Sequence, residues 1–256
     1  MVTVTLDAEV SLQKPHEDLT DFSIYIDAID KEAVRAKARP LVDRVVAATI
    51  IASESDPRFD RLSESIYLIT PDDRVLYSLT FSAEGASLLV RAPTREMESL
   101  VGRYMLASAT ESGSDLSSVF GLLRAAVDGS AEPLRAFVAA WSALEIFTNK
   151  LFKSYEQIWF DQLVRDRTTA EVAHLLRIRD VMRGKHSLTD RFTVIAVVLN
   201  AESAATDIPV FNELKRARDA LLHRRAQEKG NLPAPRVLSL THKYLRLHLE
   251  RVASAL

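Results

Sequence analysis

The sequence predicts a protein of overall α+β class, with a small mixed α+β region at the N-terminus followed by an all-α helical bundle. Two observations lead to this class. The first ninety or so residues contain short runs rich in β-branched and aromatic residues, whereas helical spacing continues from about Pro93 to the C-terminus. With 256 residues, 47% of them hydrophobic, the chain is long enough to bury a core. We therefore divide it into residues 1–92 and residues 93–256.

Five short runs in the N-terminal region have the composition of β-strands. They are residues 2–6, 22–29, 65–70, 74–81 and 86–92. Pro71, Asp72 and Asp73 separate the third run from the fourth and favour a tight turn, so these two runs are expected to form a hairpin. Residues 31–53 have helical spacing, and Pro40 is expected to kink that helix or to begin a second one.

The rest of the chain is predicted as a series of helices. The expected helices are residues 94–109, 114–129, 131–155, 168–182, 187–201, 208–229 and 235–255. Ser114 or Asp115 is expected to cap the second of them, and Gly129 to end it. The third has a broad stripe made of Phe137, Val138, Trp141, Leu144, Thr148, Leu151, Phe152 and Tyr155. The aromatic residues of this stripe are expected to lie in the core.

Composition narrows the class of protein. The formal net charge of -2 gives the whole chain no strong attraction to nucleic acid or anionic lipid, so any such preference must come from a local patch. There are no cysteines, which excludes disulfides, thiol catalysis and cysteine-ligated metals. The N-terminus lacks the layout of a signal peptide, and the longest apolar runs are shorter than the roughly 20 residues that span a bilayer. We expect a soluble, cytoplasmic protein that does not bind membranes.

The sequence lacks the motifs of several common enzyme classes. The sequence contains neither of the glycine-rich loops that cradle phosphates, and it has no H-E-x-x-H or G-x-S-x-G motif. The six histidines are scattered without the spacing typical of metal ligands. We therefore expect neither a metal ion nor a cofactor.

A basic segment near the C-terminus, residues 215–225, is the strongest candidate for chemistry. On a helical wheel Arg218 falls inside the apolar arc, where an arginine must reach water or find a carboxylate. We expect Arg218 to be at least half buried and paired with Glu145, which interrupts the stripe of its own helix. His223 falls on the polar side, four residues after Asp219, which can accept a hydrogen bond from its ring. The same pattern also fits a solvated amphipathic helix with arginines toward its C-terminal end.

The stretch Arg218-Asp219-Ala220-Leu221-Leu222-His223 contains an R-x4-H pattern with a polar residue directly after the arginine. This pattern resembles the ribonuclease motif of the HEPN superfamily (higher eukaryote and prokaryote nucleotide-binding), where it lies on a late helix of an α-helical bundle. Residues 137–152, which contain W-S-A-L-E, are similar to the opening helix of the Apea-like branch of that superfamily. The resemblance covers residues 131–254 and differs from the commonest form in having Asp219 in place of asparagine.

The resemblance implies a metal-independent endoribonuclease that uses the ribose 2′-OH as nucleophile. In such a reaction a histidine that titrates near neutrality can move protons, and a guanidinium can hold the phosphate oxygens. The implied catalytic residues are Arg218, His223 and Asp219, with Glu145 as structural support. Less specific attraction to the RNA backbone would come from Lys215, Arg216, Arg224 and Arg225.

The resemblance also implies a homodimer, in which two motifs face each other across a two-fold axis. Arg218 and His223 diverge by about 140° around the helix, so one chain does not bring both side chains to one phosphate from one face. A second copy related by a two-fold axis would supply the missing groups. The family further implies a toxin–antitoxin or phage-defence setting, with an antitoxin or defence-system protein as a partner.

Two other functions fit the same residues. One is a catalytically inactive HEPN-like module that binds RNA or serves in assembly, and the other is an unrelated helical regulator. Residues 1–90 contain no nucleophile with a neighbouring base, so we expect them to sense, dock or regulate.

Overall fold

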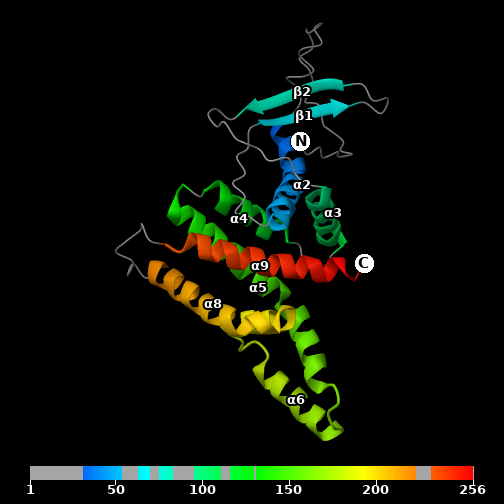
Figure 1. The fold of residues 1–256 in the computed structure, drawn as a ribbon, viewed down its shortest axis with the longest axis vertical. Helices are drawn as coiled ribbons and strands as arrows, with labels where there is room; N and C mark the ends of the chain where they lie inside the picture. Colours follow the sequence, from blue (N-terminus) through cyan, green and yellow to red (C-terminus); the bar gives the residue numbers. More distant parts are fainter. Residues whose placement is uncertain are drawn as a thin grey trace, which may run out of the picture. The chain divides into compact units, whose positions relative to one another are not determined.

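The computed structural model describes residues 31–53, 63–69, 75–82, 95–110, 116–129, 131–222 and 232–255 of the chain (Figure 1). The chain divides into two compact units. The first consists of Met1–Asp43 and Pro57–Pro93, and the second of Arg44–Asp56 and Thr94–Leu256.

The prediction of an overall α+β class is wrong, because the described part of the chain is dominated by eight helices. Of the five expected strands, the described ranges hold only the predicted hairpin, in which β1 (Ser63–Ile69) pairs antiparallel with β2 (Val75–Ser82). The other three expected strands and the turn Pro71–Asp73 lie outside the described residues. A two-stranded hairpin is too small to form one layer of a core, so the class follows from the helices.

The helix expected at residues 31–53 is present as α2 (Lys31–Ala52), and it continues through Pro40. Its residues from Arg44 onward belong to the second unit. There Ile50 and Ile51 are buried, which ties the end of this helix to the core of the bundle.

The second unit is a helical bundle built around α5 (Pro133–Val164). With 32 residues this helix is about 48 Å long. It packs against α4 (Ser117–Asp128), α7 (Leu188–Leu199) and α9 (Ala234–Ala253). The helix α3 (Arg95–Thr110) packs on α9 in turn.

One face of α5 supplies much of the core. Its buried residues are Ala136, Phe137, Ala139, Ala140, Trp141, Ala143, Leu144, Phe147, Thr148, Leu151, Phe152, Tyr155 and Phe160. The predicted core position of its aromatic residues is confirmed, whereas Val138, also assigned to that stripe, is 47% exposed. The helix extends past residue 155, where the sequence predicted its end.

An aromatic cluster joins four helices at the centre of the bundle. Phe192 of α7 stacks on Phe211 of α8 (Ala201–Leu222) with ring centroids 4.1 Å apart. Phe211 also contacts Trp141 of α5 at 5.5 Å, and Phe192 meets the edge of Tyr244 of α9 at 4.9 Å. Burial of these rings fixes where α8 lies against α5.

The helix α8 begins seven residues before its predicted start at residue 208 and contains Pro209. Its first turn is capped by Asn200, whose side-chain Oδ1 accepts a hydrogen bond from the Ser203 N–H at 3.1 Å. Asp207 then accepts hydrogen bonds at 2.7 Å from both Lys243 Nζ and Tyr244 Oη, which ties α8 to α9.

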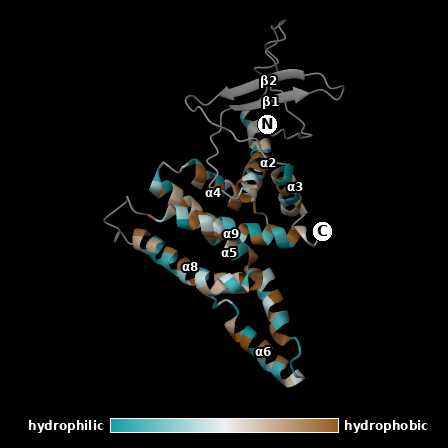
Figure 2. Ribbon diagram, in the orientation of Figure 1, coloured by the Kyte–Doolittle hydropathy of each residue, from teal (hydrophilic) through white to brown (hydrophobic). Residues whose placement is uncertain are grey.

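Helix ends elsewhere follow the predicted residues closely. Gly129 ends α4 as expected, while Ser114 and Asp115, its predicted caps, lie outside the described residues. The helix α6 (Thr169–Met182) begins with a capping box between Thr168 and Glu171. No residue of α6 is buried, and Figure 2 shows hydrophilic and hydrophobic residues alternating along it.

Among the helices that the structure describes, none is both long and apolar enough to pass through a membrane.

Candidate functional site

The candidate site lies where α5 meets α8. Trp141 and Glu145 stand one turn apart on α5, and Arg218 lies on α8, two turns after Phe211. Because Phe211 packs against Trp141, the side chain of Arg218 is brought to the same surface of α5. The aromatic cluster therefore sets the position of the site.

Glu145 is held by two groups. The indole Nε1–H of Trp141 donates a hydrogen bond of 2.7 Å to Glu145 Oε2. The same oxygen lies 3.6 Å from Nη2 of Arg218. The sequence predicted the pairing of Arg218 with Glu145, but it did not predict the indole hydrogen bond.

Arg218 is enclosed on several sides. Its side chain is 23% exposed, so the expectation that it would be at least half buried is met. The guanidinium Cζ lies 5.2 Å from the centroid of the Trp141 ring, within the range of a cation–π contact. Its Nη1 forms an ion pair of 3.0 Å with Asp219 Oδ1. Its Nε is buried and has no hydrogen-bond partner within the described ranges.

The charges around Arg218 are balanced. Lys215 Nζ lies 3.4 Å from Asp219 Oδ2, so the four side chains are two cations and two carboxylates. Arg216, the next predicted RNA-contacting residue, is exposed on α8. In this arrangement the guanidinium is well oriented, but its charge is opposed by Glu145 and Asp219.

Three predicted site residues, His223, Arg224 and Arg225, lie outside the described residues. The hydrogen bond that Asp219 was expected to accept from the His223 ring therefore also lies outside the described residues. Within the described part of α8, both carboxylate oxygens of Asp219 face the cations Arg218 and Lys215.

Sequence reasoning missed the second role of Trp141. The spacing W-x3-E puts the indole and the carboxylate on adjacent turns of one helix face, which is the signal that could have found the hydrogen bond. The ring was assigned to the core alone, and it does lie there, with 3% of its surface exposed.

A second charged cluster lies further along α5, at its contact with α6. Glu156 Oε1 is 3.4 Å from Nε2 of His186 and 3.9 Å from Nε of Arg179. Arg179 also donates a 2.8 Å hydrogen bond to Gln157 Oε1 and places its Cζ 4.7 Å from the Phe160 ring centroid. These contacts join α6 and the turn after it to α5.

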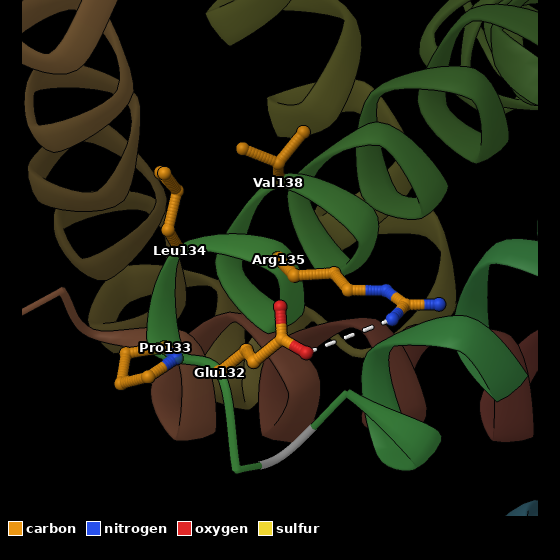
Figure 3. A pocket seen from close by; sticks show the side chains of 5 residues that line it. All are labelled: Glu132, Pro133, Leu134, Arg135 and Val138. Carbon is orange, nitrogen blue, oxygen red and sulfur yellow. Dashed lines mark ion pairs between the residues drawn. The ribbon is translucent and has the colours of Figure 1, made fainter.

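A shallow hollow of about 500 Å³ lies at the start of α5 (Figure 3). It is lined by Glu132, Pro133, Leu134, Arg135 and Val138. Its charged residues Glu132 and Arg135 pair with each other at 3.8 Å, and Leu134 and Val138 are partly exposed. The charged side chains of this hollow are largely exposed and the rest of its lining is apolar, so it is not a candidate site by itself.

Neither a metal site nor a likeness to known proteins adds residues to the candidate site. In the part of the chain that is described, no group of three or more histidine, aspartate or glutamate side chains is placed to hold a metal ion. No family model, curated protein or solved structure matches the chain.

Proposed function

We propose that the helical bundle is a metal-independent endoribonuclease in which Arg218 and His223 act on RNA. The placement of Arg218 carries the proposal. Its guanidinium is held against Trp141 and Glu145 at the surface where α5 meets α8, and it retains partial exposure. A planar, permanently charged group fixed in this way suits recognition of a phosphate.

The proposed reaction is cleavage by the neighbouring 2′-OH. A histidine takes the 2′-OH proton, and the 2′-oxygen forms a bond to the adjacent phosphorus. The bond from phosphorus to the 5′-oxygen breaks, and that oxygen takes a proton. The products are a 2′,3′-cyclic phosphate and a 5′-hydroxyl, and the role of Arg218 is to stabilise the charge on the phosphate oxygens.

A homodimer completes the proposed site. With the helical spacing that the sequence predicts for residues 208–229, Arg218 and His223 are about 140° apart, so a second chain is needed to bring an arginine and a histidine to one phosphate. Two copies also supply both the base and the acid. Arg216, Arg224 and Arg225 would then line a basic cleft, and RNA affinity would fall steeply as salt rises.

The test is cleavage of labelled single-stranded RNA by the purified full-length chain in EDTA. We expect products ending in cyclic phosphate, no cleavage by His223→Ala, and cleavage at least about 100-fold slower by Arg218→Ala. Light scattering at micromolar concentration reports the dimer. Full activity of a monomer would refute the shared site, and cleavage retained by His223→Ala would refute the proposed chemistry.

The charge balance favours a second candidate, an inactive module that binds RNA or serves in assembly. Asp219 and Glu145 both lie beside Arg218 and offset the positive charge that would stabilise the transition state of cleavage. Salt-dependent RNA binding with no cleavage, unchanged by His223→Ala, would support this function over the nuclease. An antitoxin or defence-system partner stays a prediction for either function.

A further inference from the structure

Trp141 contacts both members of the Arg218–Glu145 pair. Its ring face lies under the guanidinium, and its N–H donates to the carboxylate. The hydrogen bond of 2.7 Å and the ion-pair distance of 3.6 Å end on the same oxygen, Glu145 Oε2. The two contacts therefore compete for one acceptor.

The unequal distances indicate which contact prevails. A charge-assisted hydrogen bond between a guanidinium and a carboxylate is typically about 2.7–2.9 Å long. The Glu145–Arg218 gap is well beyond that range, while the indole bond is short. The carboxylate is thus drawn toward Trp141, so Nη2 of Arg218 has no close ion pair with Glu145, while Nη1 pairs with Asp219 at 3.0 Å.

We propose that Trp141 is a positioning residue that keeps Glu145 from closing onto Arg218, so that Nη2 of the guanidinium stays available to an RNA phosphate. The proposal rests on the proposed function, because it assigns Arg218 to phosphate binding. Among the described residues Arg218 is the cation that pairs with Glu145 Oε2, so without the indole N–H the carboxylate moves onto it. That movement competes with RNA for the same N–H groups.

Trp141→Phe isolates the effect, since phenylalanine keeps an aromatic ring under Arg218 and removes the N–H donor. The measurement is the affinity of the full-length chain for a single-stranded RNA with 2′-O-methyl groups, which cannot be cleaved by 2′-OH attack. We expect Trp141→Phe to weaken binding about tenfold, the effect of losing one contact to a charged group. The matched control is Trp159→Phe on the same helix, which lies fourteen residues and about 21 Å beyond Glu145 and should leave the affinity unchanged.

Rescue distinguishes positioning from a loss of packing. Glu145→Gln removes the charge that closes onto Arg218, so we expect the double variant Trp141→Phe with Glu145→Gln to bind as tightly as Glu145→Gln alone. A packing defect would not be repaired by the second substitution. Unchanged affinity in Trp141→Phe, or a double variant as weak as Trp141→Phe, would overturn the proposal.

A second readout separates this inference from the proposed function. In the Trp159→Phe background Trp141 is the only tryptophan, so its fluorescence reports its own surroundings. We expect Arg218→Ala to shift the emission maximum, because it removes the cation from the ring face. If the wild-type chain binds no RNA, the proposed function fails. In that case the emission maximum still tests the contact between Arg218 and the Trp141 ring. If Arg218→Ala leaves that maximum unchanged, the contact is refuted as well.

Discussion

The helix α5 carries two clusters of the same type, each with a glutamate, an arginine from another helix and an aromatic ring under that arginine. In the Arg218 cluster the ring is Trp141, and in the Arg179 cluster it is Phe160. The guanidinium–ring distances are 5.2 and 4.7 Å, and the ion-pair distances are 3.6 and 3.9 Å. Composition alone would not tell the two clusters apart.

The difference lies in what else holds each arginine. Arg179 has a 2.8 Å hydrogen bond to Gln157, and it belongs to α6, a helix with no buried residue. Its contacts with α5 are therefore needed to hold α6 in place. Arg218 belongs to α8, which Phe211 and the aromatic cluster already fix. Arg218 is therefore not needed to hold its own helix, and its partners Asp219 and Glu145 orient it at the surface of the site.

The largest expected effect is on RNA cleavage. Under the proposed function, Arg218→Ala should reduce the rate at least about 100-fold, the range seen when one donor to a developing oxyanion is removed. Arg179→Ala should stay within about twofold of the wild type, because Arg179 has a structural role. Initial rates on one labelled RNA in EDTA measure both. Similar losses in the two variants would show that the comparison between clusters is wrong.

The next effect is on the free energy of unfolding. Arg218→Ala should lower it by about 1–2 kcal/mol, less than the roughly 3–5 kcal/mol for breaking a fully buried pair. The reason is that Glu145 is 35% exposed and keeps its hydrogen bond from Trp141. Urea unfolding measures the change, and Arg218→Lys is the control that keeps the charge. A loss above that range would indicate that Arg218 supports the bundle as well as the site.

These predictions depend on features that the sequence revealed only in part. The pairing of Arg218 with Glu145 was predictable because each residue interrupts an apolar stripe at helical spacing. The competition between Trp141 and Arg218 for Glu145 Oε2 was not predictable, because it depends on how α8 packs across α5. Periodicity gives the buried face of a helix but not the helix that packs against it.

The fold was predictable to a similar degree. The helices and the hairpin were predictable from the local sequence pattern. The predicted α+β class was wrong, because short β-branched runs do not determine whether a sheet forms a layer of the core. The start of α8 was predicted seven residues too late, at residue 208, although Asn200 provides an N-cap.

A smaller effect should appear in the local stability of α6. Arg179→Ala removes the ion pair with Glu156 and the hydrogen bond to Gln157, so amide hydrogen exchange in α6 should accelerate about five- to tenfold. Exchange in α8 should stay the same. Peptide-resolved exchange measured on both variants, Arg179→Ala and Arg218→Ala, gives the contrast directly. Faster exchange throughout the bundle in Arg179→Ala would contradict a role confined to α6.

The smallest expected effect is a pH dependence that belongs to neither cluster and would otherwise be confused with that of the site. His242 of α9 donates from Nε2 to the Ile50 carbonyl, at 2.9 Å, near the end of α2. Burial lowers the pKa of His242 below its ordinary value of about 6.5, and the positive charge of Arg246 also lowers it, while the hydrogen bonds to the carbonyls of Ile50 and Ile51 oppose the shift.

The direction of the effect follows from the lowered pKa. The folded state binds the proton less readily than the unfolded state, so this contribution to stability is complete above a pH of about 6.5 and is lost as the pH falls below it. His242→Gln retains an N–H donor for Ile50 but does not titrate. Between about pH 7.5 and pH 5.5, the Tm of the wild type should therefore fall by about 2 °C more than that of His242→Gln. Thermal unfolding followed by circular dichroism at several pH values measures the difference, and equal losses of Tm would rule out His242 as its source. With this baseline known, any further change of RNA cleavage with pH can be assigned to the Arg218 site rather than to the stability of the bundle.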